Sequence, residues 1–126
     1  RSLYTTRRYT KVPRQNYELV VEGMRSAALG GTCRALANYD FMPCGKTGTA
    51  QNKGHDHSVF MGFAPMDEPK IAVAVYVENG GWGATYGVPI GGLLMERYLT
   101  GELSEASERR AADIQNRVIN YGTDNR

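Results

Sequence analysis

The sequence predicts an α+β fold in which an antiparallel sheet of three strands is flanked by helices. Three observations predict it. Strand-like segments follow one another with short turns between them, apolar residues recur at helical spacing before and after these strands, and glycine and proline mark the ends of the elements. A length of 126 residues suits one domain, and 41% apolar with 22% charged residues is an ordinary globular composition.

The first predicted helix follows residues 1–14, which lack helical periodicity and are expected to form an extended arm or a loop. Asn16 is placed as the N-cap with Glu18 in the first turn, and Gly30-Gly31 is placed as the C-terminal stop. Apolar residues recur at spacings of three and four along one face, at Leu19, Val20, Met24, Ala27 and Ala28. This pattern predicts an amphipathic helix of about three to four turns.

Three strands are predicted at residues 44–51, 58–64 and 70–78, with turns between them. The third strand is apolar on both faces, with Ile71, Val73, Val75 and Val77 on one face and Ala72, Ala74 and Tyr76 on the other. We therefore expect this strand to be covered on both sides, and we place Tyr76 and Tyr98 in the core.

The strands are followed by a helix that begins near Pro89, because proline suits the first turn of a helix, and that ends at Gly101. Residues at helical spacing define its predicted face, namely Ile90, Leu93, Leu94, Arg97 and Tyr98. Met95 and Leu99 widen this face, so the helix is expected to cover one side of the sheet.

A last helix is expected from about residue 105 to residue 121, with Ser104 as its N-cap and only a thin apolar stripe. Its polar character indicates a surface element or a partly disordered segment. We therefore divide the chain into a main portion, residues 1–101, and a polar, helical tail, residues 102–126.

Charge and hydropathy exclude several classes of function. The formal net charge is +2, and the nearest approach to a basic cluster, at residues 7–14, is typical of a solvated face, so no nucleic-acid partner is expected. No apolar run approaches the ~20 residues that span a bilayer. Because the chain does not begin with methionine, we interpret it as an excised or incomplete piece of a longer protein.

Two cysteines and two histidines are candidate ligands or reactive groups. Cys33 and Cys44 have the wrong spacing for a redox or zinc motif, so two small buried residues are the plainer interpretation, while a disulfide stays open in an oxidising compartment. His55 and His57 flank Asp56 and supply only two ligands, which are too few for zinc. We predict neither a metal nor a cofactor.

The most informative motif is the segment at residues 46–49 (KTGT), which places one cation and two hydroxyls on a short run with small neighbours. A ligand can approach such a backbone closely, and the cation and hydroxyls can hold a carboxylate. A phosphate-binding P-loop would need glycine where Asp40 stands, and a dinucleotide fingerprint would need glycine where Tyr86 stands. A polar strand end or turn is the remaining bland interpretation.

Several motifs, in order along the chain, give it a specific resemblance. After the first helix they are residues 31–33 (GTC), 45–51 (GKTGTAQ), 62–65 (GFAP), 71–75 (IAVAV) and 78–81 (ENGG). In this order the chain resembles the C-terminal end of the transpeptidase domain of class B penicillin-binding proteins, in particular those of cell elongation. The resemblance covers about residues 7–100, and the tail after Gly101 has no counterpart.

The resemblance implies a β-lactamase/transpeptidase-like fold, with a five-stranded sheet and an all-helical subdomain in the complete domain. It implies a serine-type D,D-transpeptidase that cross-links peptidoglycan stem peptides by acyl transfer and is acylated by penicillin. Lys46 and Thr49 would be catalytic, the lysine from the edge strand and the threonine through its backbone N–H in the oxyanion hole. Thr47, Gly48 and Thr49 would bind the substrate, which would add to this edge as a strand.

The same resemblance implies the partners and the location. The partners would be the peptidoglycan stem peptide, β-lactam antibiotics, the remainder of the chain's own transpeptidase domain, and the cell-wall elongation machinery in the membrane. The parent protein would be anchored at the periplasmic face of the bacterial inner membrane, with this piece itself soluble.

The chain also departs from the family pattern. No serine is followed three residues later by lysine, and no S-x-N sequence occurs, so the nucleophile and base are missing and the piece should be inactive by itself. A fragment of a serine β-lactamase or D,D-carboxypeptidase remains an alternative, as does a non-catalytic module that binds a peptide carboxylate. The GFAP and ENGG runs favour the transpeptidase. A bare edge on the third strand predicts self-association unless the rest of the domain is present.

Overall fold

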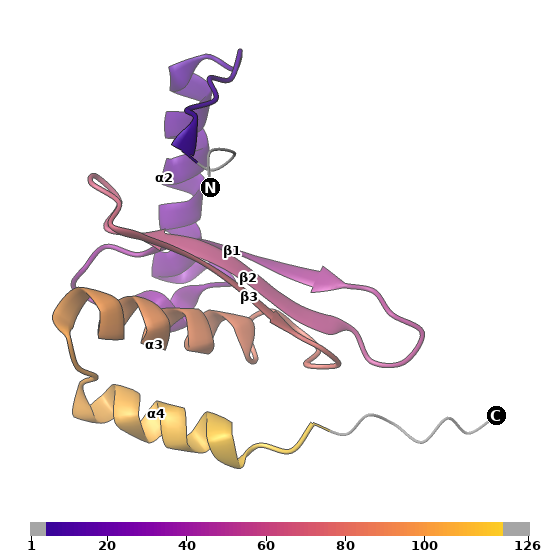
Figure 1. Ribbon diagram of the computed structural model, residues 1–126. Coiled ribbons are helices and arrows are strands. Elements are labelled where there is room, and N and C mark those ends of the chain that lie inside the picture. The colour runs from indigo at the N-terminus through magenta and orange to yellow at the C-terminus, as the bar shows by residue number, and fades with distance from the viewer. Residues whose placement is uncertain (1–4, 120–126) are drawn as a thin grey trace.

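The computed structural model describes residues 5–119. The elements are α2 (Arg14–Gly30), the 3₁₀ helix η1 (Arg34–Leu36), β1 (Cys44–Ala50), β2 (His57–Ala64), β3 (Ile71–Val77), α3 (Gly87–Thr100) and α4 (Glu105–Asn116) (Figure 1). The three strands form one antiparallel sheet in the order β1-β2-β3. The predicted α+β class, with three strands flanked by helices, is confirmed.

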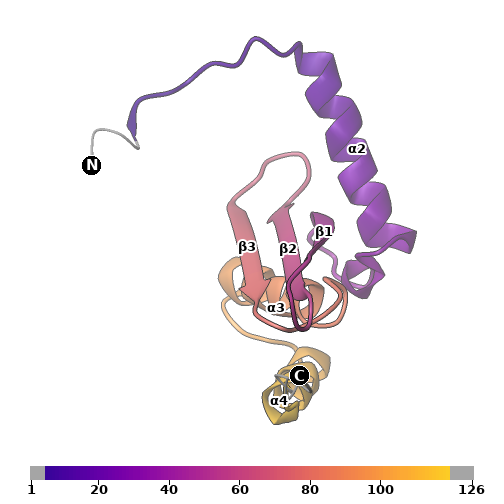
Figure 2. The ribbon, with the colours of Figure 1, turned by 90° about the vertical axis from the view of Figure 1, so that its right-hand side faces the viewer.

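The sheet, α3 and α4 form three successive layers, and α2 lies beside β1 and extends past the sheet (Figures 1 and 2). Strand register decides which side chains face which layer. Phe60 is opposite Val75 on the face toward α3, whereas Met61 is opposite Ala74 on the other face. One face of the sheet is therefore packed against a helix, and the other is open over β3.

The core lies between the sheet and α3. The end of α2 and the 3₁₀ helix η1 also contribute buried side chains to it. Its buried members are Ala28, Cys33, Leu36, Phe60, Ala64, Val75, Val88 and Met95. A Cβ added to Gly91 in α3 would lie 2.3 Å from the ring of Phe60. Glycine at this position therefore allows the helix to approach the sheet closely.

α3 buries a different face from the one that the sequence predicts. Its buried residues are Gly87, Val88, Pro89, Gly91, Gly92, Met95 and Glu96. Of the predicted face, Leu94, Arg97 and Tyr98 are exposed, so the prediction that Tyr98 is a core residue was wrong. The pattern misled because Gly91 and Gly92, which have no side chain to count as apolar, form the surface that packs against the core.

α2 begins earlier than predicted. It starts at Arg14 after Pro13, and Asn16 lies within the helix with its backbone N–H donating to the carbonyl of Pro13 at 3.0 Å. Proline suits this start because its φ is already set and it has no N–H to leave unpaired. Glu18 lies beyond the first turn and pairs with Arg14 at 2.9 Å. The predicted stop is confirmed, with Gly31 as the C-cap.

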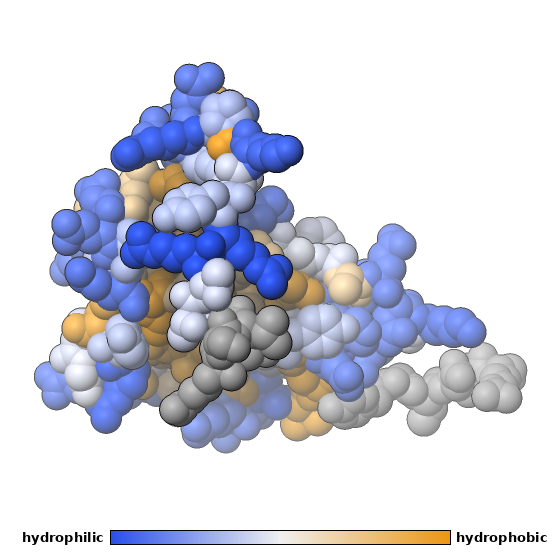
Figure 3. All heavy atoms as spheres, turned by 45° about the horizontal axis from the view of Figure 1, so that its top comes forward, coloured by the Kyte–Doolittle hydropathy of each residue, from blue (hydrophilic) through white to orange (hydrophobic). Residues whose placement is uncertain are grey.

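Some surface that the sequence predicts to be buried is exposed. Leu19 and Val20 are 66% and 60% exposed because the first part of α2 extends past the sheet (Figure 2). Ala72, Ala74 and Tyr76 are exposed on β3, and apolar surface is visible on this side of the molecule (Figure 3). The predictions of cover on both sides and of a buried Tyr76 were wrong because no helix within residues 5–119 packs on this face of β3.

α4 begins where the sequence predicts and ends earlier. The hydroxyl of Ser104 accepts a hydrogen bond from the backbone N–H of Ser107 at 3.4 Å, which confirms the N-cap. The helix ends at Asn116, and the predicted end at Tyr121 lies outside the described residues. α3 ends as predicted at Gly101, whose φ of 84° is left-handed. No helix in residues 5–119 is long and apolar enough to cross a membrane.

Candidate functional site

The KTGT segment predicted as the site, residues 46–49, lies within β1 at one edge of the sheet. β1 pairs with β2 on one side, and its other edge has no strand partner within residues 5–119. An edge strand offers unpaired backbone N–H and C=O groups with which an extended ligand can pair. The four predicted site residues therefore lie together on one open edge.

The cation and the hydroxyls of this segment project from opposite faces of β1. Lys46 is opposite Met61 on the face turned away from α3, whereas Thr47 is opposite Phe60 on the face toward α3. The Lys46 ammonium donates to the carbonyl of Thr47 at 2.7 Å, so it bends toward the strand edge. The Thr47 hydroxyl donates to the hydroxyl of Thr32 at 2.8 Å, which ties β1 to the segment that follows α2.

An open cavity of about 390 Å³ borders this edge. Its walls are formed by Thr32, Lys46, Thr47, Gly48, Thr49, Trp82, Gly83 and Ala84. Trp82 is 77% exposed and lines the cavity, so it stands at the cavity's rim. The walls carry one cation and three hydroxyls but no carboxylate, imidazole or thiol. They can hold an anionic ligand, and a serine with its base would have to come from another segment.

The loop that carries Trp82 is attached to the sheet by a residue that sequence reasoning missed. Ser58 is fully buried, and its hydroxyl donates to the Trp82 carbonyl at 2.9 Å and accepts from the Gly87 N–H at 3.1 Å. Gly83 lies so close to the sheet that an added Cβ would be 2.4 Å from the carbonyl oxygen of Val59. The feature of the sequence that could have indicated this role is a single hydroxyl residue at the start of an apolar strand.

The histidines take different positions in the same turn region. His57 accepts a hydrogen bond at Nδ1 from the backbone N–H of Asn79 at 3.0 Å, and its ring lies 5.1 Å from that of Tyr76. Asn79 has a left-handed φ of 56°, so this bond helps to set the direction of the glycine loop that leads to Trp82. His55 is exposed. Within residues 5–119 no three His, Cys, Asp or Glu side chains gather as metal ligands would.

Both cysteines are free and buried, so the plainer interpretation is confirmed and no disulfide joins them. Burial raises the pKa of the Cys33 thiol, although a hydrogen bond with Thr32 and the charge of Lys46 oppose the rise. Burial also raises the pKa of Cys44, against the opposing charge of Arg25. A raised pKa keeps each thiol protonated and weakly nucleophilic, so neither is suited to attack a substrate.

Comparison with known sequences shows which proteins this chain is similar to. Residues 5–96 match the family model described as the penicillin binding protein transpeptidase domain. A peptidoglycan D,D-transpeptidase MrdA of Haemophilus influenzae is 31% identical over 99 residues, which cover 66% of this chain and 15% of the relative. A peptidoglycan D,D-transpeptidase PbpA of Mycobacterium tuberculosis is 43% identical over 68 residues, which cover 45% of this chain and 14% of the relative.

Solved structures of penicillin-binding proteins are also similar to this chain. PBP2 of Pseudomonas aeruginosa superimposes with a TM-score of 0.66 at 38% identity, covering 75% of this chain and 22% of that one. An imipenem acyl-enzyme complex of penicillin-binding protein A from Mycobacterium tuberculosis has a TM-score of 0.60 at 34% identity. The match covers 75% of this chain and 22% of that one. The chain spans about a seventh of the curated relatives' length, namely 15% of one and 14% of the other.

Proposed function

The chain belongs to the family of penicillin-binding protein transpeptidase domains, and we propose that it supplies one wall of the active site of a serine-type peptidoglycan D,D-transpeptidase. The observation that carries the proposal is the placement of Lys46 and Thr47 on an open strand edge beside a cavity of about 390 Å³. The K-T-G sequence is one of the motifs of penicillin-binding proteins. Relatives named peptidoglycan D,D-transpeptidases support the reaction class.

In this proposal the stem peptide adds to the free edge of β1 as an extra strand. Lys46 and the hydroxyls of Thr47 and Thr49 hold its terminal carboxylate, because a cation beside hydroxyl donors is a charge-assisted anion site. The backbone N–H of Thr49 supplies one donor of the oxyanion hole, and Gly48 leaves the backbone accessible. Such a donor acts on the negative charge that develops on the carbonyl oxygen during acyl transfer.

The remaining machinery comes from the rest of the domain, because the chain contains neither S-x-x-K nor S-x-N. The serine nucleophile, the lysine base and the S-x-N serine are therefore assigned to the part of the parent that this chain does not contain. β-Lactams would acylate the same serine, and the imipenem acyl-enzyme complex of the related penicillin-binding protein A supports this step. The periplasmic face of the inner membrane and the elongation machinery are the proposed setting of the parent.

A penicillin-labelling experiment tests this division of the site. The chain by itself is expected to give no covalent adduct in intact-mass spectra after incubation with labelled penicillin, because it has no activated serine. A chimera in which residues 5–101 replace the corresponding C-terminal part of Pseudomonas aeruginosa PBP2 is expected to give one stable adduct per chain. A stoichiometric adduct on the isolated chain would refute the division, and rapid turnover by the chimera would indicate a β-lactamase instead.

The free edge of β3 is the proposed attachment point for the remainder of the domain. β3 (IAVAVYV) contains neither charge nor proline, pairs with β2 on one side, and has an exposed Ala72-Ala74-Tyr76 face. Bare apolar edges of this kind pair readily with another strand. In the parent, the proposed occupant is a strand of the same transpeptidase domain. Without it, a second copy of the chain is expected to compete for the edge.

Isolated chain is therefore expected to sediment as dimers or larger species. Replacing Ala74 with lysine puts a charge on the open face of the edge strand and should shift the chain toward monomer, because exposed lysines protect natural strand edges. Ala112→Lys on the exposed surface of α4 is the matched control and should leave the distribution unchanged. Sedimentation velocity measures both. A monodisperse wild-type monomer would contradict the expectation.

A further inference from the structure

A second cavity, of about 280 Å³, lies between α3, α4 and the segment from η1 to β1. We call it the α3–α4 cavity. Its polar walls include Tyr39, Asp40, Glu96, Thr100, Ser107 and Arg110. It shares no lining residue with the cavity at the β1 edge. The family match ends at residue 96, so the α4 wall of this cavity lies beyond the matched region.

Glu96 is the unusual feature of this cavity. It lies on α3 and is only 7% exposed. One carboxylate oxygen, Oε1, accepts a hydrogen bond from the backbone N–H of Ser104 at 3.3 Å, at the start of α4. The other oxygen, Oε2, is buried and has no hydrogen-bond partner within residues 5–119. A buried carboxylate oxygen without a hydrogen-bond donor destabilises the folded state, so a ligand that donates to this atom would be stabilising.

The cation in the cavity wall, Arg110, bonds to groups other than Glu96. Arg110 donates from Nη1 to the carbonyl of Ala35 at 3.3 Å and to the hydroxyl of Tyr39 at 3.4 Å. Its guanidinium also lies over the Tyr39 ring, 6.0 Å from the centroid. Glu96 forms no ion pair with it or with any other described residue. Asp40, exposed at the cavity, adds a second carboxylate.

These observations indicate the charge and the shape of a ligand that would fit the cavity. The cavity is lined by two carboxylates, Glu96 and Asp40, and by one guanidinium, Arg110. The donors of this guanidinium already bond to Ala35 and Tyr39, so the cavity favours a cation. A metal ion is a poor fit, since no group of three or more His, Cys, Asp or Glu side chains occurs within residues 5–119 and hard cations take six or more oxygen ligands. An ammonium group offers three N–H donors from one small charge. Tyr39 and Ser107, whose hydroxyl oxygens are 3.3 Å apart, supply further polar contacts.

We propose that the α3–α4 cavity binds a small aliphatic amine, with the Glu96 carboxylate as the counter-ion of its ammonium group. The ammonium supplies the donor that Oε2 lacks, and the alkyl part lies against the apolar wall formed with Ala35, Phe41 and Ala106. The proposal is independent of the acyl-transfer chemistry assigned to the β1 edge.

The test is a titration of the 126-residue chain with n-butylammonium chloride, followed by saturation-transfer NMR on the ligand. n-Butanol, at ionic strength matched with sodium chloride, is the uncharged ligand of equal shape. The chain is expected to bind butylammonium and to bind butanol at least roughly tenfold more weakly, because a hydrogen bond between charged groups is stronger than one to a neutral hydroxyl. This comparison needs no variant and so does not depend on the folding of one.

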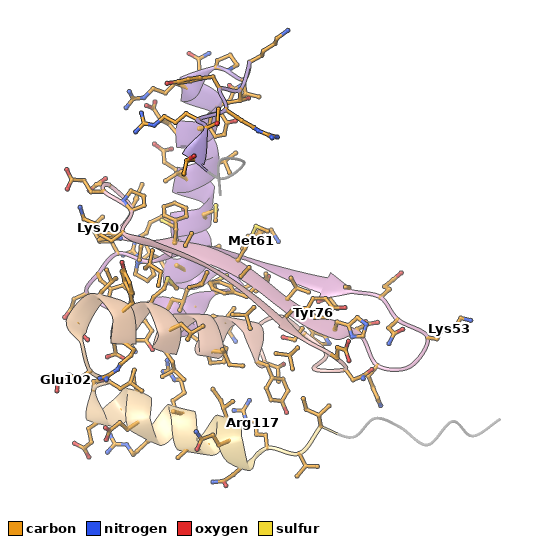
Figure 4. All side chains as sticks on the ribbon, in the orientation of Figure 1. Lys53, Met61, Lys70, Tyr76, Glu102 and Arg117 are labelled. Atoms are coloured by element: carbon orange, nitrogen blue, oxygen red, sulfur yellow. The ribbon has the colours of Figure 1, made fainter. Side chains whose placement is uncertain are left out.

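Glu96→Gln removes the charge with little change of shape and is expected to weaken butylammonium binding roughly tenfold or more. Glu102→Gln, at the exposed connection between α3 and α4, is the matched control and should bind as wild type does (Figure 4). Three results would each overturn the proposal: no butylammonium signal with wild type, equal binding of butanol, or equal binding by a folded Glu96→Gln chain.

Discussion

Replacing Lys46 with alanine in the Pseudomonas aeruginosa PBP2 chimera is expected to lower the rate of acylation by penicillin by ~10²–10⁴-fold, the range for a positioned group that assists proton transfer. In the proposed site the ammonium holds the ligand carboxylate and orients the S-x-N serine. The alanine removes both contacts at once. Intact-mass spectrometry of timed samples at several penicillin concentrations gives the second-order rate constant.

The matched control is Lys53→Ala, which removes a lysine from the exposed turn between β1 and β2 (Figure 4). It should leave the rate within about threefold of the unaltered chimera, since an exposed surface charge well away from a site contributes little. Lys46 is itself exposed, so its loss should not lower the melting temperature appreciably. An acylation rate that Lys46→Ala leaves unchanged, in a chimera that still forms the adduct, would remove the lysine from the mechanism.

The candidate site could be proposed from the sequence because its signals are local. Residues 46–49 combine the KTGT motif with glycines and with a strand-like environment, and these features can be recognised without knowing what the strand pairs with. The role of Ser58 was not predictable in the same way. Its contacts to Trp82 and Gly87 span 24 and 29 positions of the chain. Nothing near Ser58 in the sequence indicates such distant partners.

Burial was harder to predict than secondary structure. Tyr76 on β3 and Leu19 on α2 lie on apolar faces, as their spacing indicates, yet both are exposed. Periodicity shows which face of an element is apolar and leaves open whether another element covers it. In the proposed parent, additional segments would cover these faces. Glu96 shows the reverse case, since a charged residue in an ordinary helical pattern is buried, and its Oε1 accepts a hydrogen bond from the backbone N–H of Ser104 at the start of α4.

The largest expected loss of stability comes from Phe60→Ala, at ~3–5 kcal/mol in the free energy of unfolding. Phe60 is fully buried between the sheet and α3. An added Cβ at Gly45, Gly62, Gly87 or Gly91 would lie 2.3–2.8 Å from Phe60 atoms, so the residue fills space between four glycines. Glycines have no side chain that could move into the vacated volume. The cavity should therefore stay open, which places the cost toward the upper part of that range.

Urea unfolding followed by circular dichroism measures this loss, with Met61→Ala as the matched control on the same strand. Met61 is 56% exposed on the opposite face of β2, so its truncation should cost under about 1 kcal/mol. Phe60→Leu keeps most of the volume and should fall between the two variants, which retains a measurable transition if the alanine variant is largely unfolded. Small domains have roughly 5–15 kcal/mol of stability to lose. Equal losses for Phe60→Ala and Met61→Ala would show that the packing between the sheet and α3 is not the principal core of this chain.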